Sequence, residues 1–260
     1  MAPKKKNITP TGSWDLKYRP VALDEVIGQA TVINSLKTSI AGNNLRPVMI
    51  MSGQRGCGKT TTARIVARLV GAKGHDVVEI DAASSSGVDN VRSLIENASF
   101  SPLESKSKVF ILDECHMLSK PAANALLKNL EEPAPGVYWI LCTTEVGKIL
   151  PTILSRSAKF TFQAVDSGTL GAYICSVASK EGHTPAQEVL NLIIDKSGGS
   201  VRDALVSLEL VCSSGVADNV VEATKLLFGA DDSFLNQLVT AILNKDIYTK
   251  AVSISVEDVT

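Results

Sequence analysis

Residues Gly53 to Thr60, Gly-Gln-Arg-Gly-Cys-Gly-Lys-Thr, have the spacing of a phosphate-binding loop, G-x-x-x-x-G-K-[ST]. An apolar run, 48–52, precedes the loop, and a segment with helical periodicity follows it. In that setting the glycines let backbone N–H groups surround phosphate oxygens, Lys59 reaches the outer phosphates and the Thr60 hydroxyl binds Mg²⁺. The alternative is a glycine-rich turn with an exposed lysine. The residues expected to bind nucleotide here are Gly53, Arg55, Gly56, Cys57, Gly58, Lys59, Thr60 and Thr61.

A second motif, 109–114, is an apolar run that ends in two carboxylates. Asp113 is placed to bind the metal ion with Thr60, and Glu114 to polarise the attacking water. Together the two motifs make nucleotide hydrolysis the leading hypothesis. Cys115 and His116 extend the motif to D-E-C-H, but a two-lobed helicase needs a second motor domain that 260 residues cannot hold. We interpret both as local packing residues.

Strand-like and helical segments alternate in the first part of the chain. Short apolar or β-branched runs predict strands at 48–52, 77–81, 109–113, 137–143 and 159–162. Segments with apolar residues at helical spacing separate them, which favours a parallel sheet covered by helices on both faces. After about Val165 the pattern is helical only, and predicts helices at 168–181, 185–196, 200–212, 216–227 and from 234 to 243.

Composition narrows the class of protein. With 26 Lys plus Arg against 27 Asp plus Glu, the formal charge of -1 argues against a protein that coats nucleic acid by bulk charge. Five cysteines lie far apart without a C-x-x-C pair, so we expect no structural zinc and a reducing, cytoplasmic setting. Since no apolar run reaches about 18 residues, we expect no membrane span and no signal peptide. The basic segment 3–6 is interpreted as a solvent-exposed chain terminus, and a nuclear localisation signal is the alternative.

Several stretches resemble the AAA+ clamp-loader ATPases, most closely the motor subunits of bacterial replicative clamp loaders. The resemblance runs from about Trp14 to Gly229. Beside the two motifs above, it is carried by 14–20, 24–29, 79–84, 124–128, 130–133, 152–156 and 199–205. It implies an α/β P-loop domain with a five-stranded parallel sheet in the order 5-1-4-3-2, followed by a helical lid over ATP. The implied divisions are a flexible basic N-terminus at 1–13, an ATPase domain at 14–165, a lid at 166–229 and the start of a collar-like segment at 230–260.

The resemblance also implies roles for single residues. Thr144 would be the polar sensor near the γ-phosphate, Arg202 on the lid would touch the phosphates in cis, and Arg156 would reach the ATP of a neighbouring subunit. On the residues alone, a strand-end threonine and two surface salt-bridge arginines are the alternatives. The residues implied to line the adenine side are Lys17, Tyr18, Arg19 and Ile27.

The function implied is Mg²⁺-dependent ATP hydrolysis coupled to opening a sliding clamp and loading it onto primer–template DNA. Partners would be related subunits in a five-membered ring, the clamp and the DNA. Alternatives are a non-hydrolysing structural subunit and another AAA+ DNA-remodelling ATPase, for branch migration or helicase loading. DNA phosphates would meet the N-terminal ends of helices, with simple N-capping by Ser86 and Ser119 as the alternative. The residues assigned to DNA are Ser84, Ser85, Arg92, Ser119 and Lys120.

Three departures from the family pattern stand out. Only 70–76 joins the helix after the phosphate loop to the next strand, where the family usually carries a cysteine-rich zinc module. Ser157 follows Arg156 where the family usually has cysteine, and the sequence stops where an oligomerising collar would begin. A compact chain of this kind would suit a phage-encoded loader.

Overall fold

The computed structural model describes residues 12–229, so the basic segment 1–11, the helix predicted at 234–243 and the rest of 230–260 lie outside the described residues. Its contacts divide these residues into two units. The sheet unit comprises 19–166 and 199–201, and the helical unit comprises 12–18, 167–198 and 202–229. The sequence interpretation placed 14–18 in the ATPase domain, whereas the contacts group this segment with the helical unit.

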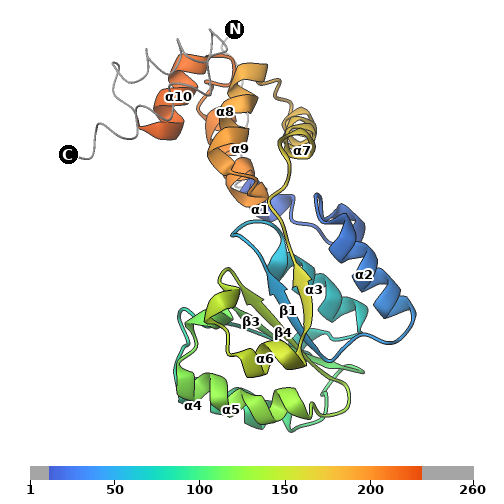
Figure 1. Ribbon diagram of the computed structural model, residues 1–260. Coiled ribbons are helices and arrows are strands. Elements are labelled where there is room, and N and C mark those ends of the chain that lie inside the picture. Colours follow the sequence, from blue (N-terminus) through green and yellow to red (C-terminus); the bar gives the residue numbers. More distant parts are fainter. Residues whose placement is uncertain (1–11, 230–260) are drawn as a thin grey trace, which may run out of the picture. The chain divides into compact units, whose positions relative to one another are not determined.

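The sheet unit (Figure 1) is built on five parallel strands. Their order is β2-β3-β4-β1-β5, which confirms the predicted order. The predicted strands match the observed ones to within about one residue. The strands are β1 (Val48–Ser52), β2 (Val77–Asp81), β3 (Lys108–Asp113), β4 (Val137–Thr143) and β5 (Ala158–Thr161).

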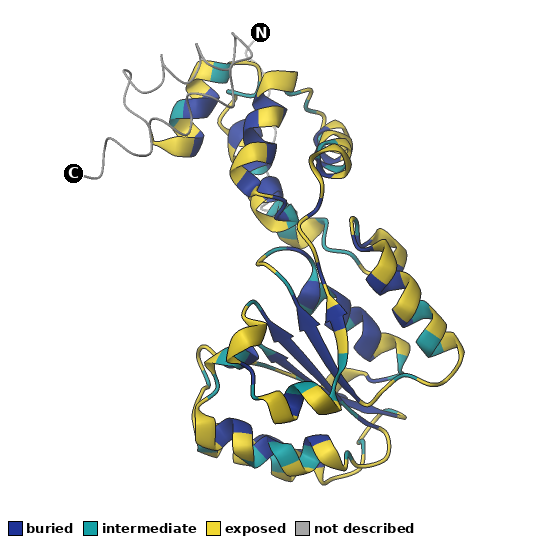
Figure 2. Ribbon diagram, viewed as in Figure 1, coloured by how far each residue is buried: buried dark blue, intermediate teal, exposed yellow. Residues whose placement is uncertain are grey.

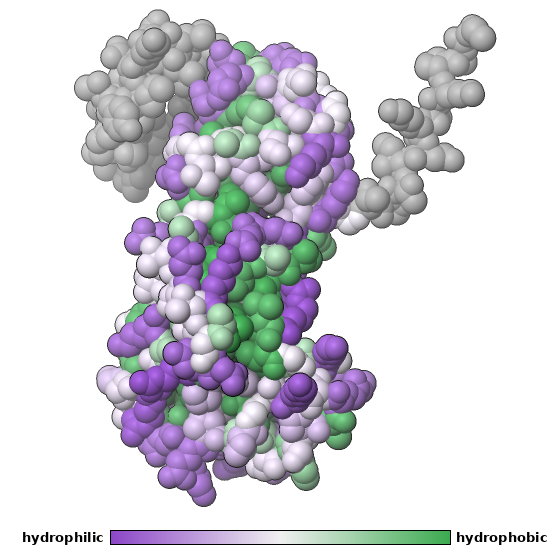
Figure 3. All heavy atoms as spheres, turned by 90° about the vertical axis from the view of Figure 1, so that its right-hand side faces the viewer, coloured by the Kyte–Doolittle hydropathy of each residue, from purple (hydrophilic) through white to green (hydrophobic). Residues whose placement is uncertain are grey.

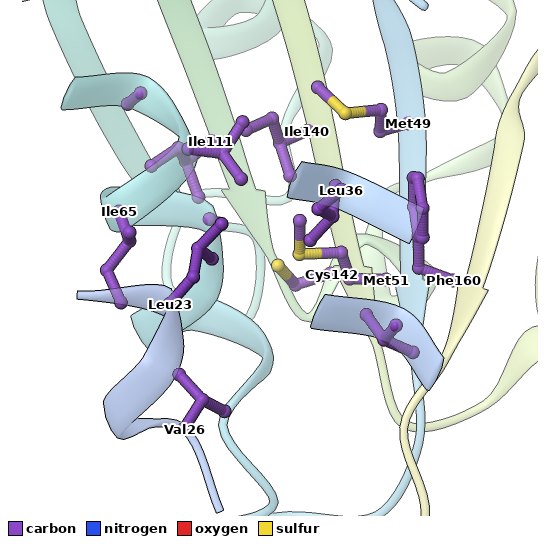
Figure 4. Packing of buried hydrophobic residues seen from close by; sticks show 14 of the residues in the cluster. Leu23, Val26, Leu36, Met49, Met51, Ile65, Ile111, Ile140, Cys142 and Phe160 are labelled. Atoms are coloured by element: carbon purple, nitrogen blue, oxygen red, sulfur yellow. The ribbon is translucent and has the colours of Figure 1, made fainter. Parts of the chain in front are cut away.

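The hydrophobic core forms two layers, one on each face of the sheet, because successive side chains of a strand point to opposite faces. In β3, Val109 and Ile111 join one buried cluster, and Phe110 and Leu112 join the other. The first cluster also holds Leu36 and the neighbours labelled in Figure 4. Both faces of the sheet are thus buried, which explains why β1, β3 and β4 are nearly continuous apolar runs. Figure 2 shows these strands in the dark blue of buried residues.

Helices cover both faces of this sheet. α2 and α3 contribute to the first cluster, and α4, α5 and α6 contribute to the second (Figure 1). The α-helices are α2 (Ala30–Ala41), α3 (Lys59–Leu69), α4 (Val88–Ala98), α5 (Lys120–Glu131) and α6 (Pro151–Arg156). The short 3-10 helices are η1 (Leu23–Glu25), η2 (Gly74–Asp76), η3 (Cys115–Met117) and η4 (Val146–Lys148).

The helical unit includes a segment from near the start of the sequence. Its elements are α1 (Trp14–Lys17), α7 (Ser167–Lys180), α8 (Gln187–Ser197), α9 (Val201–Ser213) and α10 (Val220–Phe228). Val201, the first residue of α9, is grouped with the sheet unit, and the rest of α9 belongs to the helical unit. The Ser13 hydroxyl and the Trp14 backbone N–H both donate to Glu209 Oε2 on α9, each at 2.9 Å. A carboxylate at the N-terminal end of a helix satisfies N–H groups that lack helical partners, so Glu209 both caps α1 and ties it to α9.

Glu181, just after α7, makes a second tie to the same segment. Its Oε1 accepts hydrogen bonds from Lys17 Nζ at 2.5 Å and from the Tyr18 hydroxyl. The Lys17 and Tyr18 hydrogen bonds lower the pKa of the Glu181 carboxyl. Burial, and then the Glu181 hydrogen bond, raise the pKa of Tyr18 to about 12. The phenol therefore stays neutral and the carboxylate ionised over the neutral pH range.

We expect Glu181→Gln to remove part of the acid sensitivity of the helical unit. Because the folded carboxyl has a lowered pKa, its contribution to stability is complete above the unfolded value of about 4.3 and is lost as pH falls through the folded value. Urea unfolding followed by circular dichroism at a series of pH values should show a smaller decline for the variant than for the parent. Glu188→Gln, an exposed exchange on α8, is the control. Equal declines in parent and Glu181→Gln would contradict the assignment.

All five cysteines have free thiols, four of them buried and Cys175 exposed. Among residues 12–229, no three His, Cys, Asp or Glu side chains gather into a group that could hold a metal ion. Within the same range, no helix has the length and apolar character needed to cross a bilayer.

Candidate functional site

The loop from Gly53 to Thr60 joins β1 to α3 at the carboxyl end of the sheet. A Cβ on Gly53, whose φ is +147°, would lie 2.3 Å from the Phe162 carbonyl oxygen, so only glycine fits where the loop passes this backbone. Gly58 is the N-cap of α3 with φ +103°, a left-handed conformation that turns the chain directly into the helix at Lys59. The loop therefore ends in free N–H groups at a helix N-terminus.

Lys59 lies within this loop and does not extend into solvent. Its side chain is buried, and Nζ donates to the carbonyl oxygens of Gly53 and Gln54, each at 2.8 Å. Cys57 is also buried, and its thiol donates to the Gln54 carbonyl at 2.9 Å. Burial raises the pKa of the Cys57 thiol, so the thiol stays neutral in the neutral pH range. Of the other predicted loop residues, Arg55 is exposed and Thr61 is half-buried.

The two sequence motifs meet at Thr60 and Asp113. Thr60 Oγ1 donates to Asp113 Oδ2 at 2.8 Å, and the Glu114 backbone N–H donates to Asp113 Oδ1 at 3.0 Å. Hydroxyl and carboxylate oxygens are the hard donors that Mg²⁺ prefers, so this pair fits a magnesium ion. Glu114 has φ +47°, an uncommon conformation for a residue other than glycine. Such backbone strain is found at functional sites, where surrounding contacts enforce it.

The Glu114 carboxylate contacts two side chains. Thr144, the first residue after β4, donates from Oγ1 to Glu114 Oε2 at 3.1 Å. His116 Nδ1 lies 3.4 Å from the same oxygen. The predicted sensor threonine and the predicted base are therefore in direct contact in the sheet unit.

His116 is the residue of this site that sequence reasoning missed. The interpretation as a packing residue holds for Cys115, which is buried in the second cluster, but it is incomplete for His116. The imidazole lies 3.1 Å from Thr143 Oγ1 through Nδ1 and 3.3 Å from Glu145 Oε1 through Nε2. Thr143 and Glu145 are 27 or more residues away from it in the sequence, so only the D-E-C-H string hinted at a polar role.

Gln29 anchors the phosphate loop to the segment after β5. Its Nε2 donates to the carbonyl oxygen of Gln163 at 2.8 Å and to that of Cys57 at 3.4 Å, while the Gln163 N–H donates to Gln29 Oε1 at 3.1 Å. A second anchor comes from Val201, the first residue of α9, whose N–H donates to the Gly56 carbonyl at 3.2 Å. Val201 belongs to the sheet unit, so this contact lies within that unit.

The residues assigned to the adenine side fall in both units. Lys17 and Tyr18 belong to the helical unit, where they contact Glu181, and Arg19 and Ile27 belong to the sheet unit, where both are half-buried. Arg202 belongs to the helical unit.

Arg202 and Arg156 are both paired within their own units. Arg202 Nε lies 3.6 Å from Asp15 Oδ2. Arg156, the last residue of α6, donates to the Thr152 carbonyl at 2.8 Å, and its Nη2 lies 2.8 Å from Glu131 Oε1 on α5. The salt-bridge alternative therefore describes the contacts of both arginines in this structure.

The residues assigned to DNA lie on neighbouring elements. The Ser119 N–H donates to the Ser86 carbonyl at 3.2 Å, so the loop before α4 contacts the start of α5. The Ser119 side chain caps α5 by accepting from the Ala122 N–H at 3.3 Å, whereas Gly87 and not Ser86 is the N-cap of α4. N-capping was thus right for Ser119 and wrong for Ser86. The assigned side chains are exposed or half-buried: Ser84, Ser85, Arg92, Ser119 and Lys120.

A separate groove of about 500 Å³ opens among η1, α2 and α3. It has apolar walls from Leu23, Ile40, Ile65 and Leu69, and Figure 3 shows hydrophobic surface on this side of the sheet unit. Its walls include no residue of the phosphate loop, so it is not part of the nucleotide site.

Comparison with known proteins relates this site to bacterial replication subunits. A family model described as "DNA polymerase III, delta subunit" matches residues 72–166. DNA polymerase III subunit gamma of Buchnera aphidicola (subspecies Baizongia pistaciae) is 33% identical over 255 residues, 89% of this chain and 68% of that protein. Subunit gamma/tau of Mycobacterium tuberculosis is 38% identical over 81% of this chain, which spans 40% of that protein. The chain thus spans less than half the length of several curated relatives.

Among solved structures, the fold resembles that of a branch-migration motor. The Thermotoga maritima RuvB Holliday junction branch migration motor superposes with a TM-score of 0.66 over 92% of this chain and 86% of that chain, at 20% identity. Similarity at this level shows a shared fold and carries no inference about substrate.

Proposed function

The chain belongs to the family of DNA polymerase III gamma subunits, and from this premise we propose that it is the ATPase of a sliding-clamp loader. The proposed activity is Mg²⁺-dependent ATP hydrolysis, coupled to opening a clamp and loading it onto primer–template DNA in the cytoplasm. One observation carries the hydrolytic part of the proposal. Thr60, Asp113, Glu114 and Thr144 form a continuous hydrogen-bonded group beside a buried lysine at the end of the sheet.

Nucleotide binding is assigned to the loop and its lysine. The N–H groups at the start of α3 would receive phosphate oxygens, and Lys59 would exchange the Gly53 and Gln54 carbonyls for the outer phosphates. Thr60 and Asp113 would hold Mg²⁺, which when bound neutralises charge on the phosphates. This exchange is favourable because a charged phosphate is a stronger acceptor for an ammonium group than two neutral carbonyls.

Hydrolysis is assigned to Glu114 as the group that polarises water, with Thr144 as the polar sensor. Arg202 is proposed to touch the phosphates of its own chain. This is supported by its place in the sequence, directly after Val201, whose N–H is bonded to the phosphate loop. Phosphate would then displace Asp15 as the partner of Arg202.

Assembly and DNA contact extend the proposal beyond one chain. Arg156 would reach the ATP of the next subunit in a five-membered ring of related chains. DNA phosphates would meet the adjoining segments around Ser86 and Ser119, where helix N-terminal ends and Lys120 favour phosphate without reading sequence. The partners proposed are therefore other loader subunits, a sliding clamp and primer–template DNA.

ATPase measurements with and without a sliding clamp and primed DNA test this function. We expect ATP turnover that the clamp and primed DNA together stimulate, and none in Lys59→Ala, because the outer phosphates lose their cation. ATP binding without turnover under every condition would identify a non-hydrolysing subunit. Stimulation by branched DNA but not by clamp and primed DNA would identify another remodelling ATPase.

A further inference from the structure

His116 contacts the proposed catalytic glutamate, although the mechanism above gives it no role. Its side chain is 7% exposed and lies between two carboxylates. Nδ1 faces Glu114 Oε2 at 3.4 Å and Thr143 Oγ1 at 3.1 Å, and Nε2 faces Glu145 Oε1 at 3.3 Å. A buried imidazole in this position has charged neighbours on both edges of its ring.

The neighbours of the imidazole determine whether its Nδ1 atom carries a hydrogen. A carboxylate is an acceptor only, so a ring nitrogen that faces one without a hydrogen places two lone pairs against each other. Thr143 Oγ1 accepts the Glu145 backbone N–H at 3.0 Å, and its second lone pair can accept a hydrogen on Nδ1, so Thr143 is compatible with a hydrogen there. The contact with Glu114 is therefore favourable only when Nδ1 carries a hydrogen.

Two side chains approach the same oxygen of the Glu114 carboxylate. Thr144 and His116 both approach Oε2, which leaves Oε1 as the oxygen that can address water. The Thr144 hydroxyl rotates about a single bond, whereas the His116 ring is fixed by burial and by Thr143 and Glu145. Long contacts of this kind in ligand-free sites tighten when the reacting complex forms.

We propose that His116 is a positioning residue, which holds Oε2 of Glu114 through its Nδ1 hydrogen and thereby aims Oε1 at the attacking water. The inference rests on the proposed ATP hydrolysis by Glu114. Glu145 holds the opposite edge of the ring and is itself paired with Lys148 at 2.8 Å. The orientation of the base is thus tied to a charged pair outside the phosphate loop.

Kinetics of three substitutions separate this role from packing. His116→Ala should lower kcat by about 10- to 100-fold with KM for ATP unchanged, because Glu114 is misoriented while the phosphate loop is intact. His116→Asn should recover most of kcat, since its amide nitrogen can occupy the Nδ1 position. His116→Gln should not, since its amide reaches the Nε2 position instead. His75→Ala, at a histidine whose side chain is 83% exposed, is the control.

Parental kcat in His116→Ala, an equal loss in all three variants, or a rise in KM that accompanies the loss would overturn the proposal. A second measurement does not depend on activity. Nitrogen-15 spectra of the histidine rings should show a hydrogen on Nδ1 of His116, and its signal should shift in Glu114→Gln while those of His75 and His183 stay unchanged. Absence of the hydrogen or of the shift refutes the contact even if the parent hydrolyses no ATP, whereas a parent that shows both features without turnover refutes the proposed function alone.

Discussion

Glu114→Gln should bind ATP as the parent does and hydrolyse it about 10² to 10⁴ times more slowly, the range that a positioned general base contributes. Binding should persist because the exchange leaves Lys59, Thr60 and the loop amides in place. Hydrolysis should fail because an amide polarises water far less than a carboxylate does. Equilibrium titration with a fluorescent ATP analogue and single-turnover hydrolysis measure the two effects separately.

The matched control for this experiment is Glu188→Gln, the same exchange at an exposed position of α8. It should leave both binding and turnover at the parental level. Turnover of Glu114→Gln at the parental rate would show that another group activates the water. Loss of ATP binding in Glu114→Gln would instead show that the carboxylate maintains the phosphate site.

Arg156→Ala should bind ATP normally and lose about 10³ to 10⁵ in rate, the worth of an arginine supplied to a transferring phosphoryl group. Arg156 is the last residue of α6 and lies just before β5, the edge strand of the sheet. Its ion pair with Glu131 is partly solvated, with 38% of the arginine side chain exposed. Exposed pairs of this kind contribute about 1 kcal/mol or less, so a neighbour's phosphates can displace Glu131 at little cost.

A mixing experiment tests whether the arginine acts on a neighbouring chain. Arg156→Ala and Lys59→Ala should each be inactive, and their mixture should regain activity at interfaces that join an intact Lys59 to an intact Arg156. Arg46→Ala, at an exposed arginine in the same unit, is the control. An inactive mixture in which mixed oligomers are demonstrated, or a fully active Arg156→Ala, would return Arg156 to the status of a surface residue.

Local sequence patterns were sufficient to predict the strands, because each strand is marked by its own apolar run. The apolar runs that became β1, β3 and β4 are buried on both faces, and such strands need no information from elsewhere in the chain to be recognised. Their order in the sheet is different, since five similar apolar runs do not encode which neighbours pair. That order came from family resemblance, and the structure confirmed it.

Long-range contacts account for what the sequence did not predict. His116 was interpreted as a packing residue because Thr143 and Glu145 are brought to it only by the pairing of β3 with β4. Trp14 was placed with the ATPase domain on the resemblance of 14–20 and 24–29 to clamp-loader ATPases. Its contact with Glu209 spans 195 residues, and no local pattern reports a pairing at that separation.

The hydrogen bonds from Ser13 and Trp14 to Glu209 also determine when the helical unit can fold during synthesis of the chain. Ser13 and its partner Glu209 are 196 residues apart, so at 5–20 residues per second the ribosome needs about 10 to 40 s to produce the second after the first. All five strands, the last ending at Thr161, are made within that interval. The nascent chain therefore has all five strands available for folding while α1 still lacks the carboxylate that caps it. The helical unit closes last, although α1 is made before any of the strands.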